Sequence, residues 1–258
     1  MANDQNWYLE YKKNSNAALR LFCFHHSGGG ASTYHPWIEY LSPHIEMIAI
    51  QLPGRENRFT EPLNSDLNYI ITQLSKNFDH YKNKPFIVFG HSLGGLLSYE
   101  FIKAIYQAYS LYPCHIVVSA AKAPHMPYRR KILSQLDDKL LKEELKAYNG
   151  IDESIQNEPE LLDLFLPIIR SDFSIIENYS FRGSASFPCD ILAFSGIEDH
   201  AVNEEEILGW SVYTTGKFKH MPFSGRHFFI KDHQKEIIKI INQIAERYSK
   251  LIEWAGFN

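Results

Sequence analysis

Short apolar runs alternate along this chain with longer segments in which apolar residues recur every three or four positions. This alternation predicts strands separated by helices, as in parallel βαβ units. Several runs are apolar at both odd and even positions, which is expected of strands covered on both faces. The predicted strands lie at about 20–25, 46–50, 85–90, 115–120, 189–196 and 217–223. The pattern therefore predicts an α/β fold, with a mostly parallel central sheet flanked by helices.

Helical periodicity marks three segments around these strands. The first, 66–78, begins at Asp66, a residue type that commonly caps helix N-termini. The second, 93–109, follows a glycine-rich turn, and the third, 232–251, lies near the end of the sequence.

One long stretch, from about 125 to 180, contains helical patterns but no strand. A helical insertion between two strands is where a lid over an active site is often found, although an ordinary pair of surface helices is the alternative. We therefore expect a single domain over 1–258 with a helical lid insertion at about 125–180. Some of its apolar positions should line a cavity, or else pack between helices: Leu161, Leu162, Leu164, Phe165, Leu166, Ile168 and Ile169.

Composition and charge narrow the class of protein. The 258 residues are 45% hydrophobic and 22% charged, which suits a globular domain with a sizeable core. The net charge of −4 is dispersed, which argues against a nucleic-acid partner. No apolar run has the length of a membrane span, and the polar start lacks a signal-peptide pattern. The cysteines Cys23, Cys114 and Cys189 lie in apolar runs without a CxxC or HExxH pattern, so we expect reduced thiols, no metal and a cytoplasmic location.

The segment Gly90-His91-Ser92-Leu93-Gly94 matches G-x-S-x-G directly between a predicted strand and a predicted helix. In that context the turn holds its serine in a strained conformation with the hydroxyl exposed. The motif thus predicts Ser92 as a nucleophile and the α/β-hydrolase version of the fold.

A serine hydroxyl needs a neighbouring base, which in this fold follows the serine and the acid along the chain. His227 lies in a loop between the last strand and the last helix, where the carboxyl ends of parallel strands present their chemistry. The other downstream histidines are His115, His125, His200, His220 and His233. Because His115 opens a strand and His220 lies within one, His227 is the predicted base.

The acid that orients the histidine should follow the strand at 189–196. Asp190 precedes this strand and therefore lies at the wrong end of the sheet. Glu198 and Asp199 both follow it. We favour Asp199, which begins an Asp-His-Ala-Val turn, and expect Glu198 to be a solvated surface charge.

Two backbone N–H groups should form the oxyanion hole. Leu93 follows the nucleophile and supplies one, and the loop His25–Gly30 is placed to supply the other. Three consecutive glycines after a strand are also typical of nucleotide-binding phosphate loops. The Lys-Ser/Thr ending of such a loop and an acidic residue for a ribose are missing, however, which argues against nucleotide binding. An oxyanion turn is the better interpretation.

With these residues assigned, nearly the whole chain resembles the type II thioesterases, the stand-alone editing hydrolases of nonribosomal peptide and polyketide (antibiotic) synthesis. Outside the serine motif, the segments that carry the resemblance are LFCFHHSGGG, Gln51–Arg58, Pro167–Asp172, Gly196–Val202 and Gly225–Phe229. Gln51–Arg58, which contains Leu-Pro-Gly-Arg-Glu, is the most discriminating because generic esterases of this fold lack it. In two places the chain departs from the family: His25 replaces a usual proline, and Ser-Leu-Gly-Gly replaces the commoner Ser-Met-Gly-Ala.

The resemblance implies that Ser92, Asp199 and His227 form a catalytic triad and that the Ser27 and Leu93 N–H groups bind the oxyanion. It also implies an acyl or aminoacyl thioester on the phosphopantetheine arm of an acyl or peptidyl carrier protein as substrate, no cofactor, no membrane partner and a monomer. Two alternatives stay open: a general carboxylesterase, and a catalytically silent module that only binds carrier proteins.

Overall fold

The computed structural model describes residues 7–148, 158–183 and 186–254. In these residues the chain forms a seven-stranded sheet with the order β1-β3-β2-β4-β5-β6-β7. β1 pairs antiparallel with β3, and all other neighbours are parallel. The strands are β1 (Tyr8–Lys12), β2 (Leu19–Phe24), β3 (Ile45–Ile50), β4 (Phe86–His91), β5 (His115–Ser119), β6 (Asp190–Gly196) and β7 (Phe218–Phe223).

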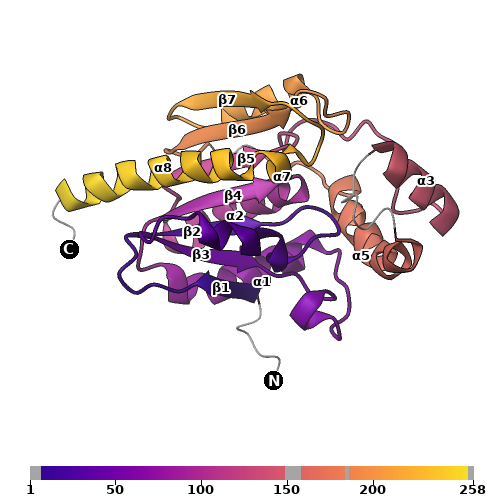
Figure 1. The fold of residues 1–258 in the computed structure, drawn as a ribbon, viewed down its shortest axis with the longest axis horizontal. Helices are drawn as coiled ribbons and strands as arrows, with labels where there is room; N and C mark the ends of the chain where they lie inside the picture. The colour runs from indigo at the N-terminus through magenta and orange to yellow at the C-terminus, as the bar shows by residue number, and fades with distance from the viewer. Residues whose placement is uncertain (1–6, 149–157, 184–185, 255–258) are drawn as a thin grey trace.

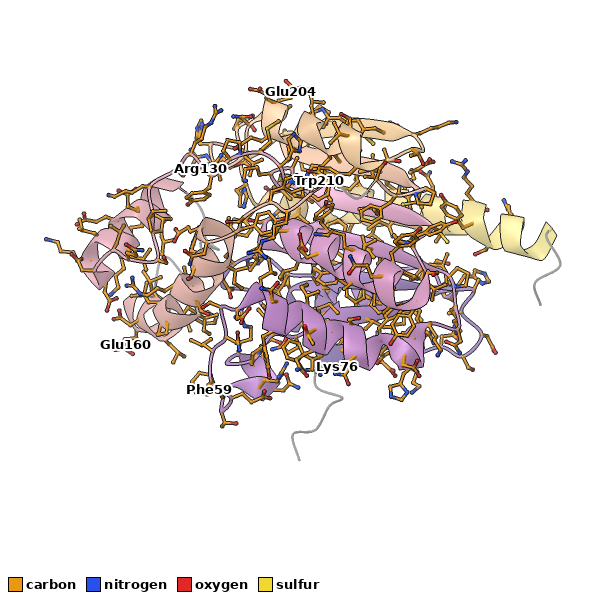
Figure 2. The ribbon with its side chains drawn as sticks, turned by 180° about the vertical axis from the view of Figure 1, so that it is seen from behind. Phe59, Lys76, Arg130, Glu160, Glu204 and Trp210 are labelled. Atoms are coloured by element: carbon orange, nitrogen blue, oxygen red, sulfur yellow. The ribbon has the colours of Figure 1, made fainter. Side chains whose placement is uncertain are left out.

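Helices cover both faces of this sheet. α8 (Gln234–Trp254) lies in front of the sheet in Figure 1, and α1 (Leu67–Asn77) and α2 (Leu93–Tyr109) cover the opposite face, seen in Figure 2. The short elements are η2 (Ala31–Glu39), η3 (Glu56–Arg58), η4 (Phe78–Tyr81), α6 (Glu204–Leu208), η5 (Gly209–Tyr213) and α7 (Phe229–Asp232). No helix in the described ranges is both long and apolar enough to cross a membrane.

The central strand β2 shows why the strands are apolar at every position. Leu21 and Cys23 point into the core beneath α8, while Phe22 and Phe24 point into the core beneath α1 and α2. Phe24 and Phe101 of α2 have ring centroids 5.3 Å apart. Because successive side chains alternate between two buried faces, the strand ends are held rigidly and can position a site.

The predicted fold class is confirmed, and each predicted strand is present with its ends within one residue of the expected position. Asp66 caps α1 as expected, because its carboxylate accepts from the N–H groups of Asn68 and Tyr69. Strand β1 was not predicted. Its sequence YLEYK carries charged residues that hide the pattern, and it is an edge strand held by antiparallel pairing with β3 and by the Tyr8 hydroxyl, which donates to the Leu74 carbonyl at 2.6 Å.

Helices α3 (Asp138–Tyr148) and α5 (Pro159–Glu177) form the insertion between β5 and β6, at one end of the sheet (Figure 1). Its own small core consists of Leu133, Leu141, Leu145, Leu162, Leu166 and Ile169. Leu162, Leu166 and Ile169 therefore take the packing role that was the alternative to cavity lining. Leu161 and Leu164 are exposed.

His115, at the start of β5, is buried, and its burial makes the stability of the fold depend on pH. Burial lowers the pKa of its imidazole from 6.5 to about 4, against a smaller opposing effect of Asp190. Neither ring nitrogen has a hydrogen-bond partner among the described residues. Unfolding restores the ordinary pKa, so the unfolded chain binds the extra proton first. Stability therefore falls as the pH drops from about 6.5 towards about 4.

Replacing His115 by Phe should remove part of this acid destabilisation. One pKa unit corresponds to about 1.4 kcal/mol. Between pH 6.5 and 4 the free energy of unfolding should therefore fall less in the variant than in the parent, by up to about 3 kcal/mol. Urea unfolding at a series of pH values measures the difference, with exposed His80→Gln as the control. Identical pH slopes for parent and His115→Phe would contradict the assignment.

Candidate active site

Ser92 lies at the sharp turn between β4 and α2, with φ 57° and ψ −118°. This left-handed conformation is strained for a residue with a side chain. Two backbone hydrogen bonds hold it: the Ser92 N–H donates to the Ser119 carbonyl at 2.8 Å, and the Gly95 N–H donates to the Ser92 carbonyl at 2.9 Å. The turn directs the serine side chain to the carboxyl end of the sheet, as the motif predicted.

The glycines of this turn are required by close backbone approach. A Cβ at Gly94 would lie 2.1 Å from the Phe24 carbonyl oxygen, and one at Gly90 would lie 2.2 Å from the Gly94 carbonyl oxygen. Such distances are far below van der Waals contact. Any larger residue would push α2 away from β2 and displace Ser92.

The structure brings the three predicted triad residues together. Nε2 of His227 lies 2.9 Å from Oγ of Ser92, and Nδ1 lies 2.8 Å from Oδ2 of Asp199. Since an ionised carboxylate only accepts hydrogen bonds, Nδ1 carries the proton and Nε2 is free to accept the serine proton. His227 and Asp199 are 6% and 1% exposed at their side chains, so this hydrogen-bonded chain is shielded from water.

Asp199 is held firmly in its role. Its second carboxylate oxygen, Oδ1, accepts from the N–H groups of Ala201 at 2.7 Å and Val202 at 3.2 Å. Glu198 is exposed, as expected of a surface charge, but it also makes two hydrogen bonds to the His227 loop. Its carboxylate accepts a hydrogen bond from the Gly225 N–H, and its own N–H donates to the Gly225 carbonyl at 3.1 Å. Glu198 thus fastens the loop that carries His227, an effect that the sequence pattern did not indicate.

The loop His25–Gly30 forms a tight turn beside Ser92. The Gly29 N–H donates to the His26 carbonyl at 3.0 Å, and Gly28 has φ 76°. A positive φ at the third position of a turn is typical of type II turns and favours glycine. The N–H groups of Ser27 and Leu93 have no acceptor among the described residues, and both residues line the cavity at Ser92. Both N–H groups are therefore available for a substrate oxygen.

Three further buried histidines lie in the two turns of the site without adding charge: His25 and His26 in the loop His25–Gly30, and His91 directly before Ser92. Burial lowers the pKa of His25 to about 3 and that of His26 to about 4, and burial also lowers the pKa of His91 well below 6.5. The His91 ring lies 5.4 Å from the His227 ring, and its Nδ1 pairs with the Ser119 hydroxyl at 2.9 Å. At neutral pH all three are uncharged, so they do not oppose protonation of His227 during a reaction.

Two cavities meet the candidate site. The smaller, about 80 Å³, contains Ser92, Ser27 and His227 and is also lined by Leu96, Phe173, Ile176 and Tyr179. The larger, about 510 Å³, is lined by Leu164, Phe165 and Ile168 of α5 together with Phe59 and Lys231. Figure 2 shows Phe59 and α5, which carries Glu160, at the same end of the molecule. His26 and Phe228 line both cavities, with ring centroids 4.9 Å apart.

These linings refine the expectation for the insertion. Leu164, Phe165 and Ile168 do line a cavity, but not the one that contains Ser92. Sequence reasoning missed Phe173 and Ile176, which reach the serine cavity. Their spacing from Ile169, four and then three residues, was the available signal for one continuous helical face.

Comparison with known proteins assigns the family. A family profile described as "Thioesterase domain" matches residues 19–245, most of the chain. The chain belongs to the thioesterase family. This thioesterase is 34% identical to the gramicidin S biosynthesis protein GrsT of Aneurinibacillus migulanus over 91% of the chain and 92% of that protein. It is 33% identical to a protein named linear gramicidin dehydrogenase LgrE of Brevibacillus parabrevis, over 94% and 93%.

Solved structures agree with this assignment. The type II thioesterase BorB from the borrelidin biosynthetic cluster superposes with a TM-score of 0.86 at 30% identity, covering 95% of this chain and 100% of that one. The resemblance to type II thioesterases is thereby confirmed, and the protein is a thioester hydrolase.

The choice of Asp199 over Glu198 can be tested directly. Asp199→Asn should lower kcat by roughly 10⁴-fold while leaving the fold intact, because the amide favours the wrong imidazole tautomer. Glu198→Gln keeps an oxygen acceptor for the Gly225 N–H and should retain most of the activity. Steady-state hydrolysis of an acyl-pantetheine thioester, with circular dichroism to check folding, measures both. Reversed phenotypes would show that the acid is Glu198.

Proposed function

We propose that this protein is a serine thioesterase that releases acyl or aminoacyl groups from the phosphopantetheine arm of carrier proteins and so clears misprimed synthetase modules. The observation that carries the proposal is the continuous hydrogen-bonded chain Ser92–His227–Asp199. It lies at a cavity that also holds the Ser27 and Leu93 N–H groups, for which the described part of the chain offers no acceptor. These features supply a nucleophile, a base and an oxyanion site to a member of the thioesterase family.

Acylation follows from this geometry. Nε2 of His227 takes the proton from Oγ of Ser92, 2.9 Å away, as Oγ bonds to the thioester carbon. The carbonyl oxygen gains negative charge and is bound by the Ser27 and Leu93 N–H groups. Leu93 is the first residue of α2, so the positive end of the helix dipole also favours this charge. When the C–S bond breaks, the pantetheine sulfur leaves as a thiol with the proton from His227.

Deacylation repeats these steps with water. His227 removes a proton from the water as its oxygen bonds to the acyl carbon, and the proton is then returned to Oγ of Ser92 as the ester bond breaks. Asp199 stays ionised and stabilises the imidazolium in both halves. A thiol has a pKa of about 8.5, so it is a good leaving group and no metal or organic cofactor is needed.

The proposed partner is an acyl or peptidyl carrier protein. GrsT is named for gramicidin S biosynthesis and BorB for the borrelidin biosynthetic cluster, and the likeness to each covers more than nine-tenths of this chain. We further propose a cytoplasmic monomer. The free thiols Cys23, Cys114 and Cys189 support a reducing compartment.

The size of the serine cavity suggests the acyl group. The cavity has a volume of about 80 Å³ and is lined by Phe173 and Ile176. From this small volume we propose a preference for short acyl chains. The helical insertion would then act as a lid, because Phe173 and Ile176, which line the cavity, belong to α5.

The glycine-rich loop does not favour dinucleotide chemistry, which the name of LgrE would suggest. Its Gly28 N–H already donates to the Asp172 carboxylate at 2.8 Å. A pyrophosphate needs such N–H groups for itself, and this one is already occupied. Hydrolysis therefore remains the function that the site supports.

The central test compares three substrates that carry the same short acyl group: acyl-carrier protein, acyl-pantetheine and an aryl ester. We expect kcat/KM to be highest for the acyl-carrier protein. Ser92→Ala should lower kcat on all three by on the order of 10⁶-fold, as loss of a triad nucleophile does.

Each alternative function gives a different result in this test. Preference for the aryl ester would indicate a general carboxylesterase. Binding of the carrier protein without turnover of any substrate would indicate a silent binding module.

Phe173→Ala should shift the preference towards longer acyl chains by enlarging the serine cavity. Each added methylene accommodated in such a pocket is worth about 1–3 kcal/mol, so a 10-fold or larger change in relative kcat/KM is expected. Leu164→Ala on the same helix is the control, because Leu164 is exposed and lines the other cavity. A C2–C8 acyl-pantetheine series measures the change. Equal selectivity in both variants would place the acyl group elsewhere.

A further inference from the structure

Side chains of the segment Gln51–Glu56 hold the first turn of η2. The Gln51 side-chain oxygen accepts from the Ala31 N–H at 2.6 Å, and its nitrogen donates to the Arg55 carbonyl at 2.9 Å. The Glu56 carboxylate accepts from the hydroxyl of Ser32 at 2.6 Å and from its N–H at 3.2 Å. These hydrogen bonds give a structural role to the Leu-Pro-Gly-Arg-Glu segment, which most clearly distinguishes the family from generic esterases.

Arg55 and Asp172 form the centre of this arrangement. The Arg55 guanidinium binds both carboxylate oxygens of Asp172, each at 2.7 Å, and it also donates to the Gly29 carbonyl at 2.9 Å. Asp172 comes from α5, and its Oδ2 also accepts from the Gly28 N–H at 2.8 Å. The side chains are 3% and 0% exposed. One buried ion pair thus joins the helical insertion to two successive residues of the turn.

The ion pair fixes the peptide next to the proposed oxyanion donor. In the peptide that links Ser27 to Gly28, the Gly28 N–H is bound by Asp172, and the Ser27 carbonyl pairs with Nδ1 of His26 at 2.9 Å. Both ends of this peptide plane are therefore fixed. Rotation about the Ser27 backbone, which would turn its own N–H away from the cavity, would break one of these bonds.

We propose that Arg55 and Asp172 are positioning residues that aim the Ser27 N–H at the oxyanion, so that α5 takes part in catalysis and does not only cover the site. This inference rests on the serine mechanism proposed above. Stability alone is a weak reason for such a pair, because a buried ion pair can often be replaced by apolar residues of similar volume without loss. What apolar residues cannot replace is the acceptor for the Gly28 N–H.

Two variants separate positioning from folding. Arg55→Lys keeps the positive charge but loses the planar fork that reaches Gly29 and both oxygens of Asp172. The double variant Arg55→Met with Asp172→Leu removes the pair without leaving an unpaired buried charge. The matched controls are Arg20→Lys and the double variant Arg20→Met with Glu46→Leu. Arg20 and Glu46 form another buried ion pair, 9% and 6% exposed, at the opposite end of β2.

The readout is kcat and KM for acyl-pantetheine, normalised to active sites titrated with a phosphonofluoridate, and the Ki of an acyl trifluoromethyl ketone. This ketone forms an oxyanion on Ser92 and therefore reports the oxyanion site. For both Arg55 variants we expect kcat to fall on the order of 10²-fold, with KM within about twofold and Ki raised in parallel. The Arg20 variants should change the melting temperature only.

Three outcomes would overturn the proposal. KM could rise with kcat unchanged, which would mean that the pair only docks the insertion for binding. The loss could vanish after correction for titrated sites, which would mean that the pair acts through stability. The Arg20 variants could lose the same activity as the Arg55 variants. Failure of the serine mechanism itself is distinguishable, because Ser92→Ala would then remain active in the same assay.

Discussion

The strained backbone of Ser92 is the constraint on which the rest of the site depends. A left-handed residue with a side chain costs about 1–3 kcal/mol and persists only where its surroundings over-determine it. Here β4 enters the turn, β5 accepts the Ser92 N–H, and β2 passes so close that only glycine fits at position 94. The sheet, buried on both faces, supplies this rigidity. The conformation in turn points the hydroxyl out of the sheet and leaves the Leu93 N–H without an acceptor within residues 7–148, 158–183 and 186–254.

Each remaining part of the site is placed by the end of a different strand. Asp199 follows β6, His227 follows β7, and the loop with Ser27 follows β2. Because parallel strands bring their carboxyl ends to one edge, groups up to 135 residues apart meet there with hydrogen-bond accuracy. Asp199 is fixed from both sides, by His227 and by two backbone N–H groups. The imidazole of His227 is therefore already oriented to accept the proton of the Ser92 hydroxyl.

Sequence reasoning reached the strands and the triad because both follow local rules. Periodicity marks the strands, and chain order together with strand ends selects His227 and Asp199. It missed features that depend on contacts distant in sequence. The edge strand β1 is fixed by pairing with β3, since its own pattern is obscured by charge. The bond between Glu198 and the Gly225 N–H, and the partnership of Arg55 with Asp172 across 117 residues, leave no periodic trace. Likewise, only the three-dimensional arrangement shows that Leu164 and Phe173, on one helix, face different cavities.

The position of Asp172 has a consequence for how such enzymes can diversify. Phe173 and Ile176, which bound the serine cavity, lie within the same turn or the next turn of α5 as Asp172. A shift of this helix that made room for a larger acyl group would also pull on the turn at Gly28. Point substitutions leave the helix in place. Exchange of whole insertions between relatives therefore endangers the turn at Gly28 and with it the activity. Replacement of single side chains along an undisturbed α5 can change the acyl specificity without moving this turn.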